Sequence, residues 1–153
     1  MHLGHLKMME YVASRSKYLV VGIGSCNRQG TQDNPFSAQE REQMIKESLE
    51  LPVPYELKRI PDFDDSLKWI SWIRENIHFD VFASNSAVEK KIFEDAGFKA
   101  TDIPFYDREK YSSTQIRERI ISGGDWQSLL PAGTIRVMSE IGGVDRIREL
   151  AKQ

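Results

Sequence analysis

Two histidines stand close together at the start of the sequence, in the segment Met1-His2-Leu3-Gly4-His5. Apolar side chains recur at helical spacing from there to Ser14, so the histidines fall in the first turn of a predicted helix. A helix N-terminus carries unpaired N–H groups and a partial positive charge, and imidazoles there strengthen an anion site. The pattern predicts that His2 and His5 bind one phosphate group. Taken alone, a chance pairing of histidines in a disordered start is the alternative.

A second segment with phosphate-binding residue types lies late in the sequence, at Tyr111-Ser112-Ser113-Thr114-Gln115-Ile116-Arg117. The hydroxyls of Ser112, Ser113 and Thr114 can cap a helix whose first turn presents N–H groups to an anion. Arg117 follows one turn later, and a guanidinium binds phosphate oxygens with charge-assisted hydrogen bonds. An ordinary helix cap followed by a solvated arginine is the other interpretation of this segment alone.

Composition predicts one soluble domain over residues 1–153, with 40% hydrophobic and 29% charged residues. The net charge of −2 provides no basic field to attract nucleic acid, so no nucleic-acid partner is expected. The single cysteine, Cys26, excludes an internal disulfide and predicts a reducing, cytoplasmic location. No apolar run approaches membrane-spanning length, so no membrane partner is expected either.

Apolar patterns and turn residues predict alternating helices and strands. Such alternation indicates an α/β fold, a Rossmann-like parallel sheet with helices on both faces, in which ligands bind at the carboxyl ends of the strands. A helical C-terminal tail over about 113–153 follows. The predicted order is a helix over 4–14, a buried parallel strand over 18–23, a helix from 37 to about 49, a strand over 55–60, a helix carrying Leu67 to Ile73, another inner strand over 80–83, a helix over 85–96, a strand over 99–103 and helical pieces to 151.

Several segments, in order, resemble the archaeal-type nicotinamide-nucleotide adenylyltransferases of the His-x-Gly-His nucleotidyltransferase superfamily. The matching segments are His2 to His5, Val21 to Ser25, Asn34 to Arg41, Trp69, Tyr111 to Arg117, Gly124 to Pro131 and Glu140 to Ile147. The resemblance implies transfer of the adenylyl group of ATP to nicotinamide mononucleotide (NMN) by direct in-line attack, giving NAD and pyrophosphate with Mg²⁺. It also implies a homo-oligomer.

The resemblance further implies the roles of individual residues. His2, His5 and Arg117 are the expected catalytic residues, and phosphate oxygens and water, rather than protein ligands, are expected to hold the Mg²⁺. The residues expected to bind ATP are His2, Gly4, His5, Ser112, Ser113, Thr114 and Arg117, and those expected to bind NMN or NAD are Ser25, Asn34, Phe36, Trp69 and Asn85. For Trp69 a core position is the alternative, and for Ser25 and Asn85 it is a turn-forming role. For Asn34 and Phe36 the alternative is an ordinary turn over Asp33 to Phe36.

The opening strand expected before the helix at Gly4 is missing from the sequence, which begins at Met1. In the family that strand lies in the middle of the sheet. Its absence exposes backbone on both flanking strands, so either a rearrangement that closes the gap or another chain that fills it is expected.

Two other functions stay open. One is a different adenylyl- or cytidylyltransferase of the same superfamily, acting on an acceptor such as phosphopantetheine; Trp69 and the Asn34-Pro35-Phe36 segment argue against it. The other is a non-catalytic nucleotide-binding form, which the absent strand would explain.

Overall fold

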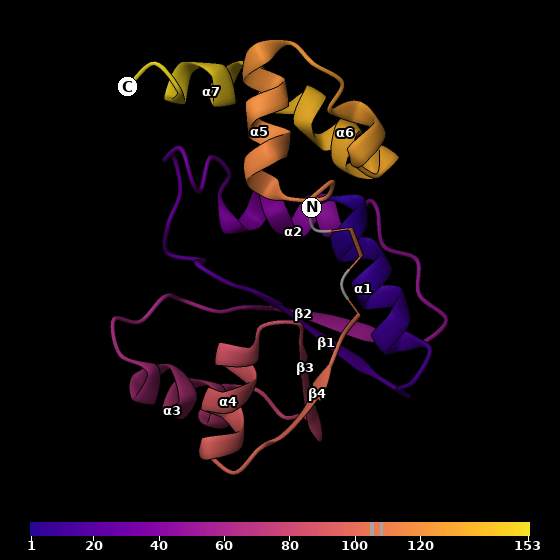
Figure 1. Cartoon of the computed structure of the whole chain (residues 1–153), viewed down its shortest axis with the longest axis vertical. Helices are drawn as coiled ribbons and strands as arrows, with labels where there is room; N and C mark the ends of the chain where they lie inside the picture. Colours follow the sequence, from indigo (N-terminus) through magenta and orange to yellow (C-terminus); the bar gives the residue numbers. More distant parts are fainter. Residues whose placement is uncertain (105, 108) are drawn as a thin grey trace.

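The computed structural model describes residues 1–104, 106–107 and 109–153. Helices and strands alternate through the first two thirds of the chain, so the predicted α/β class is confirmed (Figure 1). The elements are α1 (Leu3–Ala13), β1 (Leu19–Ile23), α2 (Ala38–Lys46), β2 (Tyr55–Arg59), α3 (Ser66–Asn76), β3 (Val81–Ser84), α4 (Ala87–Asp95), β4 (Lys99–Asp102), α5 (Ser113–Ser122), the 3₁₀ turn η1 (Gln127–Leu129), α6 (Ala132–Glu140) and α7 (Gly143–Leu150).

The start of α2 shows how local sequence sets these boundaries. Ser37 Oγ accepts a hydrogen bond from the N–H of Glu40 at 3.1 Å, and Glu40 Oε2 accepts one from the N–H of Ser37 at 2.8 Å. This reciprocal pair satisfies two N–H groups that the first turn of a helix leaves unpaired. The helix therefore begins just after Ser37, as the sequence predicts.

The strands form two separate parallel pairs. β1 pairs with β2, from Leu19 opposite Tyr55 to Ile23 opposite Arg59. β3 pairs with β4 in the same parallel sense, and no ladder joins the two pairs within the described residues. The predicted closure of the gap by rearrangement is therefore not seen, and filling of the gap by another chain stays a prediction.

Both edges that face the gap carry backbone groups turned away from their own partner strand. The N–H of Leu19 donates to Pro54 O and the N–H of Ile60 donates to Ile23 O, at 3.1 and 2.9 Å. Because alternate residues of a strand direct their backbone groups to opposite sides, Val20 and Gly22 turn theirs toward the gap. On β3, the N–H of Ile103 donates to Ser84 O, so Ser84 directs its carbonyl group toward β4. By the same alternation, Val81 and Ala83 direct their backbone groups toward the gap.

The gap is part of a cavity of about 1490 Å³ that every residue of β1 and β3 lines. The sequence predicted these strands as buried inner strands, and this is wrong for most of their residues. Only Ile23 in β1 and Ser84 in β3 are buried, and Val81 is 47% exposed. Among the described residues each of these strands has a hydrogen-bonded neighbour on one side only, and this leaves its other edge open.

The helices pack into apolar clusters around these strand pairs. Phe93 of α4 stacks on Phe82 of β3 with ring centroids 3.7 Å apart. In Figure 1, α5, α6 and α7 lie together on one side of α2, and the strands lie on the other side. Ile120 and Val137 are fully buried between these C-terminal helices. In the described part of the chain, no helix combines the length and apolar character needed to span a bilayer.

Candidate active site

His2 and His5 cap each other at the start of α1. The N–H of His5 donates to His2 Nδ1 at 3.3 Å, and the N–H of His2 donates to His5 Nδ1 at 3.5 Å. Their rings stack with centroids 3.7 Å apart. Because each Nδ1 accepts a hydrogen bond from backbone, the proton of each neutral ring resides on Nε2. Both imidazoles therefore have an N–H donor left for a ligand.

The electrostatic surroundings keep both rings neutral in the ligand-free protein. Loss of hydration lowers the pKa of His2 to about 4, with a further contribution from the positive chain terminus. The His5 side chain is accessible to solvent and lines the cavity. Loss of hydration is the largest cause that lowers the pKa of His5 to about 3, followed by the nearby His2 ring and the positive chain terminus. A protonated His5 that stabilises charge therefore requires a bound anion to raise its pKa.

Close packing of Gly4 joins the two predicted phosphate-binding segments. A Cβ added at Gly4 would lie 2.8 Å from the Cβ of Tyr111, so only glycine lets the two segments approach this closely. One residue later, Ser112 caps α5 by accepting a hydrogen bond from the N–H of Gln115 at 3.2 Å. The N-terminal ends of α1 and α5 are therefore neighbours, as Figure 1 also shows.

Arg117 is only weakly held in the ligand-free site. Its Nη2 lies 3.5 Å from Asp33 Oδ1 and 3.5 Å from Thr114 Oγ1, which is the long limit for a hydrogen bond. The Asp33 side chain is 91% exposed, whereas that of Arg117 is 20% exposed. A phosphate entering the cavity can replace Asp33 with little loss, because exposed ion pairs contribute little.

The cavity contains most, but not all, of the residues selected from the sequence. Trp69 lies partly buried on α3 with its ring edge-on to Phe93 at 5.3 Å, so it lines the cavity and packs against the core at once. Asn85 does not line the cavity, and its amide nitrogen contacts Met8 Sδ at 3.7 Å. The selected residues that line the cavity are His2, His5, Ser25, Asn34, Phe36, Trp69, Ser113 and Arg117, and those outside its lining are Gly4, Asn85, Ser112 and Thr114.

Of the other charged residues that line the cavity, Arg41 and Asp62 are functional candidates that the sequence did not indicate. Arg41 comes from α2 and Asp62 from the segment after β2, and both contact the turn at Ser25. Arg41 lies one turn after the helix cap at Ser37, and its partners Gly24 and Ser25 lie 17 and 16 positions earlier in the sequence, where no local pattern reveals them. The contacts of Asp62 depend on the pairing of β1 with β2, which its own neighbours in the sequence do not specify.

Donors for anions therefore gather where parallel strands end and two helices begin, as in nucleotide-binding α/β proteins. The chain belongs to the cytidylyltransferase-like family, whose model matches residues 1–119. It is 37% identical over 151 residues to a protein of Methanococcus aeolicus named nicotinamide-nucleotide adenylyltransferase, covering 97% of this chain and 88% of that one. A protein of Halorubrum lacusprofundi with the same name is 38% identical, with 99% and 87% covered.

Solved structures agree on the fold. A bifunctional NMN adenylyltransferase/ADP ribose pyrophosphatase from Francisella tularensis, complexed with AMP and a manganese ion, superposes with a TM-score of 0.78 at 18% identity. The superposition covers 98% of this chain and 48% of that one, so this chain spans about half of the bifunctional protein. A second structure of the same protein gives a TM-score of 0.80.

Proposed function

We propose that this chain transfers the adenylyl group of ATP to NMN, giving NAD and pyrophosphate, as a single nucleotidyltransferase domain over residues 1–153. The observation that carries the proposal is that His2, His5 and Arg117 line one cavity, in a chain 37% identical to the M. aeolicus adenylyltransferase along nearly its whole length. A general adenylyl- or cytidylyltransferase would need the same phosphate-binding groups. NMN is favoured as acceptor because Trp69 lines the cavity as well.

The reaction needs positioning and charge stabilisation more than it needs a base. An oxygen of the NMN phosphate attacks the α-phosphorus of ATP, a new P–O bond forms, and the bond to the bridging oxygen of the β-phosphate breaks. The electron pair leaves with pyrophosphate. Since the attacking phosphate is already ionised, the protein must align two polyanions and stabilise the charge that develops between them.

The residues at the starts of α1 and α5 are suited to ATP. We assign the Nε2–H groups of His2 and His5 to the phosphates, with His5 nearest the transferred group. Arg117 exchanges Asp33 for the β- and γ-phosphates and can bind two oxygens at once. The N–H groups that begin each helix add further donors. The complete proposed ATP set is His2, Gly4, His5, Ser112, Ser113, Thr114 and Arg117.

The residues on the strand side are suited to NMN. The indole of Trp69 offers a face to the cationic nicotinamide ring, an arrangement favoured by the ring quadrupole. Ser25, Asn34 and Phe36 line the same cavity. Asn85 completes the proposed NMN set, and to reach the ligand its amide must leave the sulfur of Met8, a weak acceptor that costs little to give up.

A divalent ion fits this site only together with a nucleotide. Among the residues described, no group of three or more His, Cys, Asp or Glu side chains could hold a metal. We therefore propose that Mg²⁺ enters with ATP and is held by phosphate oxygens and water, as this small ion commonly is. The ion would neutralise phosphate charge, while the histidines and Arg117 orient the phosphates.

Residues outside the proposed ATP and NMN sets support a location and an oligomeric state for the enzyme. We propose a cytoplasmic enzyme, since Cys26 is a free thiol. A homo-oligomer is supported by large apolar side chains at the surface, with Leu67 of α3 74% exposed and Val88 of α4 72% exposed. Nucleic acid and membrane partners form no part of the proposal.

The test is NAD formation by the purified chain with ATP, NMN and Mg²⁺, with phosphopantetheine or CTP substituted in parallel reactions. NAD formed only with ATP and NMN supports the proposal. Turnover only with another acceptor or nucleotide contradicts it in favour of a related transferase. Binding of ATP and NMN by calorimetry without turnover contradicts it in favour of the non-catalytic form, which the separated strand pairs would explain.

A further inference from the structure

The turn after β1 has an uncommon backbone conformation. Ser25 has a φ of +52°, in the left-handed region that non-glycine residues adopt rarely. Such a residue keeps this conformation only when its surroundings hold it there, and it is found most often at functional sites. Ser25 lines the cavity directly beyond the carboxyl end of β1.

Arg41 holds this turn from the α2 side. Its Nη1 donates to the carbonyl oxygen of Gly24 at 2.7 Å, and its Nη2 donates to that of Ser25 at 2.8 Å. Its Nε makes a longer bond to Ser37 O, at 3.4 Å. Within the part of the chain that is described, Arg41 has no ion-pair partner. Its bonds to the turn are therefore not shared with a carboxylate.

Asp62 holds the same turn from the side of β2. Ser25 Oγ donates to Asp62 Oδ1 at 2.7 Å, and Asp62 Oδ2 pairs with Arg28 Nε at 2.7 Å. The N–H of Asp62 donates to Asn27 Oδ1 at 2.9 Å. The residues after β1 are thus fixed to the end of β2 by side chains on both segments.

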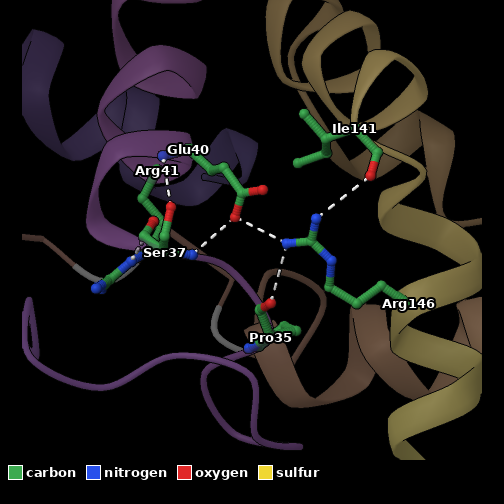
Figure 2. Close-up of polar contacts among 6 residues, drawn as sticks. All are labelled: Pro35, Ser37, Glu40, Arg41, Ile141 and Arg146. Atoms are coloured by element: carbon green, nitrogen blue, oxygen red, sulfur yellow. Dashed lines mark hydrogen bonds and ion pairs between the residues drawn. The ribbon is translucent and has the colours of Figure 1, made fainter.

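The first turn of α2, which carries Arg41, is itself anchored. Glu40 Oε2 accepts a hydrogen bond from Arg146 Nη1 of α7 at 2.8 Å. Arg146 also donates to Pro35 O, next to Phe36, at 3.4 Å. Figure 2 shows Arg41 and Arg146 extending to opposite sides of Ser37. One helical turn thus links the segment that carries Ser25 to the segment that carries Phe36.

We propose that Arg41 is a positioning residue for the acceptor nucleotide, acting through the turn at Ser25. By binding the carbonyl oxygens of Gly24 and Ser25, it fixes the backbone that places Ser25 at the cavity. The Ser25 hydroxyl gives its proton to Asp62, so its oxygen is left to accept a hydrogen bond from a ribose hydroxyl of NMN. Asp62 fixes the rotamer of that hydroxyl. This inference rests on the proposed function and adds a residue to the same site.

The test compares Arg41→Ala with a matched control, Arg59→Ala. Arg59 is an arginine that pairs with Glu42 of the same helix and does not line the cavity. Loss of two charge-assisted hydrogen bonds should raise the KM for NMN by about tenfold or more in Arg41→Ala. The KM for ATP should stay within about twofold. Arg59→Ala should match the wild type, and added ethylguanidinium should lower the KM for NMN in Arg41→Ala only.

A merely structural role of Arg41 would give a different result. Both KM values would then change together with the midpoint of thermal unfolding, ethylguanidinium would not restore NMN binding, and the proposal would be overturned. If Arg41→Ala does not fold, the test is repeated with Arg41→Lys. A single ammonium group cannot reproduce the bidentate hydrogen bonding of the guanidinium to the carbonyl oxygens of Gly24 and Ser25. Absence of NAD formation by the wild type contradicts the proposed function, whereas wild-type turnover with an unchanged KM in the variant overturns only the role of Arg41.

Discussion

The imidazole rings of His2 and His5 lie 3.7 Å apart, and each accepts a hydrogen bond from the backbone N–H of the other residue. The pair acts as the cap of α1 and presents two ring N–H groups to the same cavity. One arrangement therefore serves both the start of a helix and the proposed binding of phosphate.

Stability should fall in acid because both histidine pKa values are lowered in the folded protein, from 6.5 to about 4 and about 3. The unfolded chain binds these protons first, so the stabilisation is fully present above about pH 6.5 and is lost as the pH falls through 4 and then 3. NMR titration of the ring protons should give both values below 5 in the free protein. ATP should raise them, and values of 6.5 or above without ATP would contradict this account.

Replacement of Gly4 by alanine should separate α1 from the segment before α5. The new Cβ would lie 2.8 Å from the Cβ of Tyr111 and 3.0 Å from Nδ1 of His2. The Cβ of Tyr111 can move only with its backbone, and the His2 ring can turn away only by weakening its bond from the N–H of His5. We expect a loss of about 1–3 kcal/mol of unfolding free energy, typical of overpacking, and a loss of NAD formation. Gly124→Ala is the control, since its nearest neighbours are 3.7 Å away. Equal urea midpoints for the two variants would show that the contact is not tight.

The ion pair between Glu40 of α2 and Arg146 of α7 should contribute measurably to the free energy of unfolding. Burial raises the pKa of Glu40, but hydrogen bonds from Arg146 and Ser37 outweigh it and hold that pKa below its ordinary value. Arg146→Met should lower the unfolding free energy by about 1–2 kcal/mol, because it removes a charge-assisted bond from a partly buried pair. Lys46→Met, which removes a more exposed pair with Glu42, should cost less than about 0.5 kcal/mol. Equal losses in urea unfolding would argue against a special role for Arg146.

Hydrogen exchange should detect the open edges of the two strand pairs. The amides of Val20 and Gly22 point toward the gap, whereas those of Leu19 and Val21 point toward β2. We expect exchange at Val20 and Gly22 to be faster than at Leu19 and Val21, since unpaired amides exchange without local opening. Uniform protection along β1 would contradict an open edge and support the other expectation, that another chain fills the gap.

Local signals were enough to predict most of the elements. The start of α2 just after Ser37 agrees with the helix predicted from 37. Gly97, with a φ of +86°, follows α4, whose end agrees with the helix predicted over 85–96. These features depend on residues within a few positions of one another. The bond between Ser25 and Asp62 joins residues 37 positions apart, and it exists only because β1 and β2 end at the same edge. No local pattern contains that information.

The predicted burial of β1 and β3 was wrong, because only Ile23 and Ser84 in these strands are buried. The run Leu19-Val20-Val21-Gly22-Ile23 has the composition of a strand covered on all sides, and the same composition suits a strand whose inner edge is open. Apolar content reports which faces can be buried and not which neighbours are present. The contacts of Arg41 were missed for a related reason, since its partners are backbone carbonyls and carry no side-chain signature.

The most direct test of the account is the rate of NAD formation from ATP and NMN by the wild type, His5→Ala and His78→Ala. Both histidines line the cavity, but His5 lies at the start of α1 and His78 lies just before β3 begins, at the amino end of the strands. We predict that His5→Ala lowers kcat/KM by about 100-fold or more, as loss of one preorganised donor does, and that His78→Ala leaves it unchanged. Equal rates for the wild type and His5→Ala, or a larger loss in His78→Ala, would contradict the assignment of the phosphate site to the paired histidines.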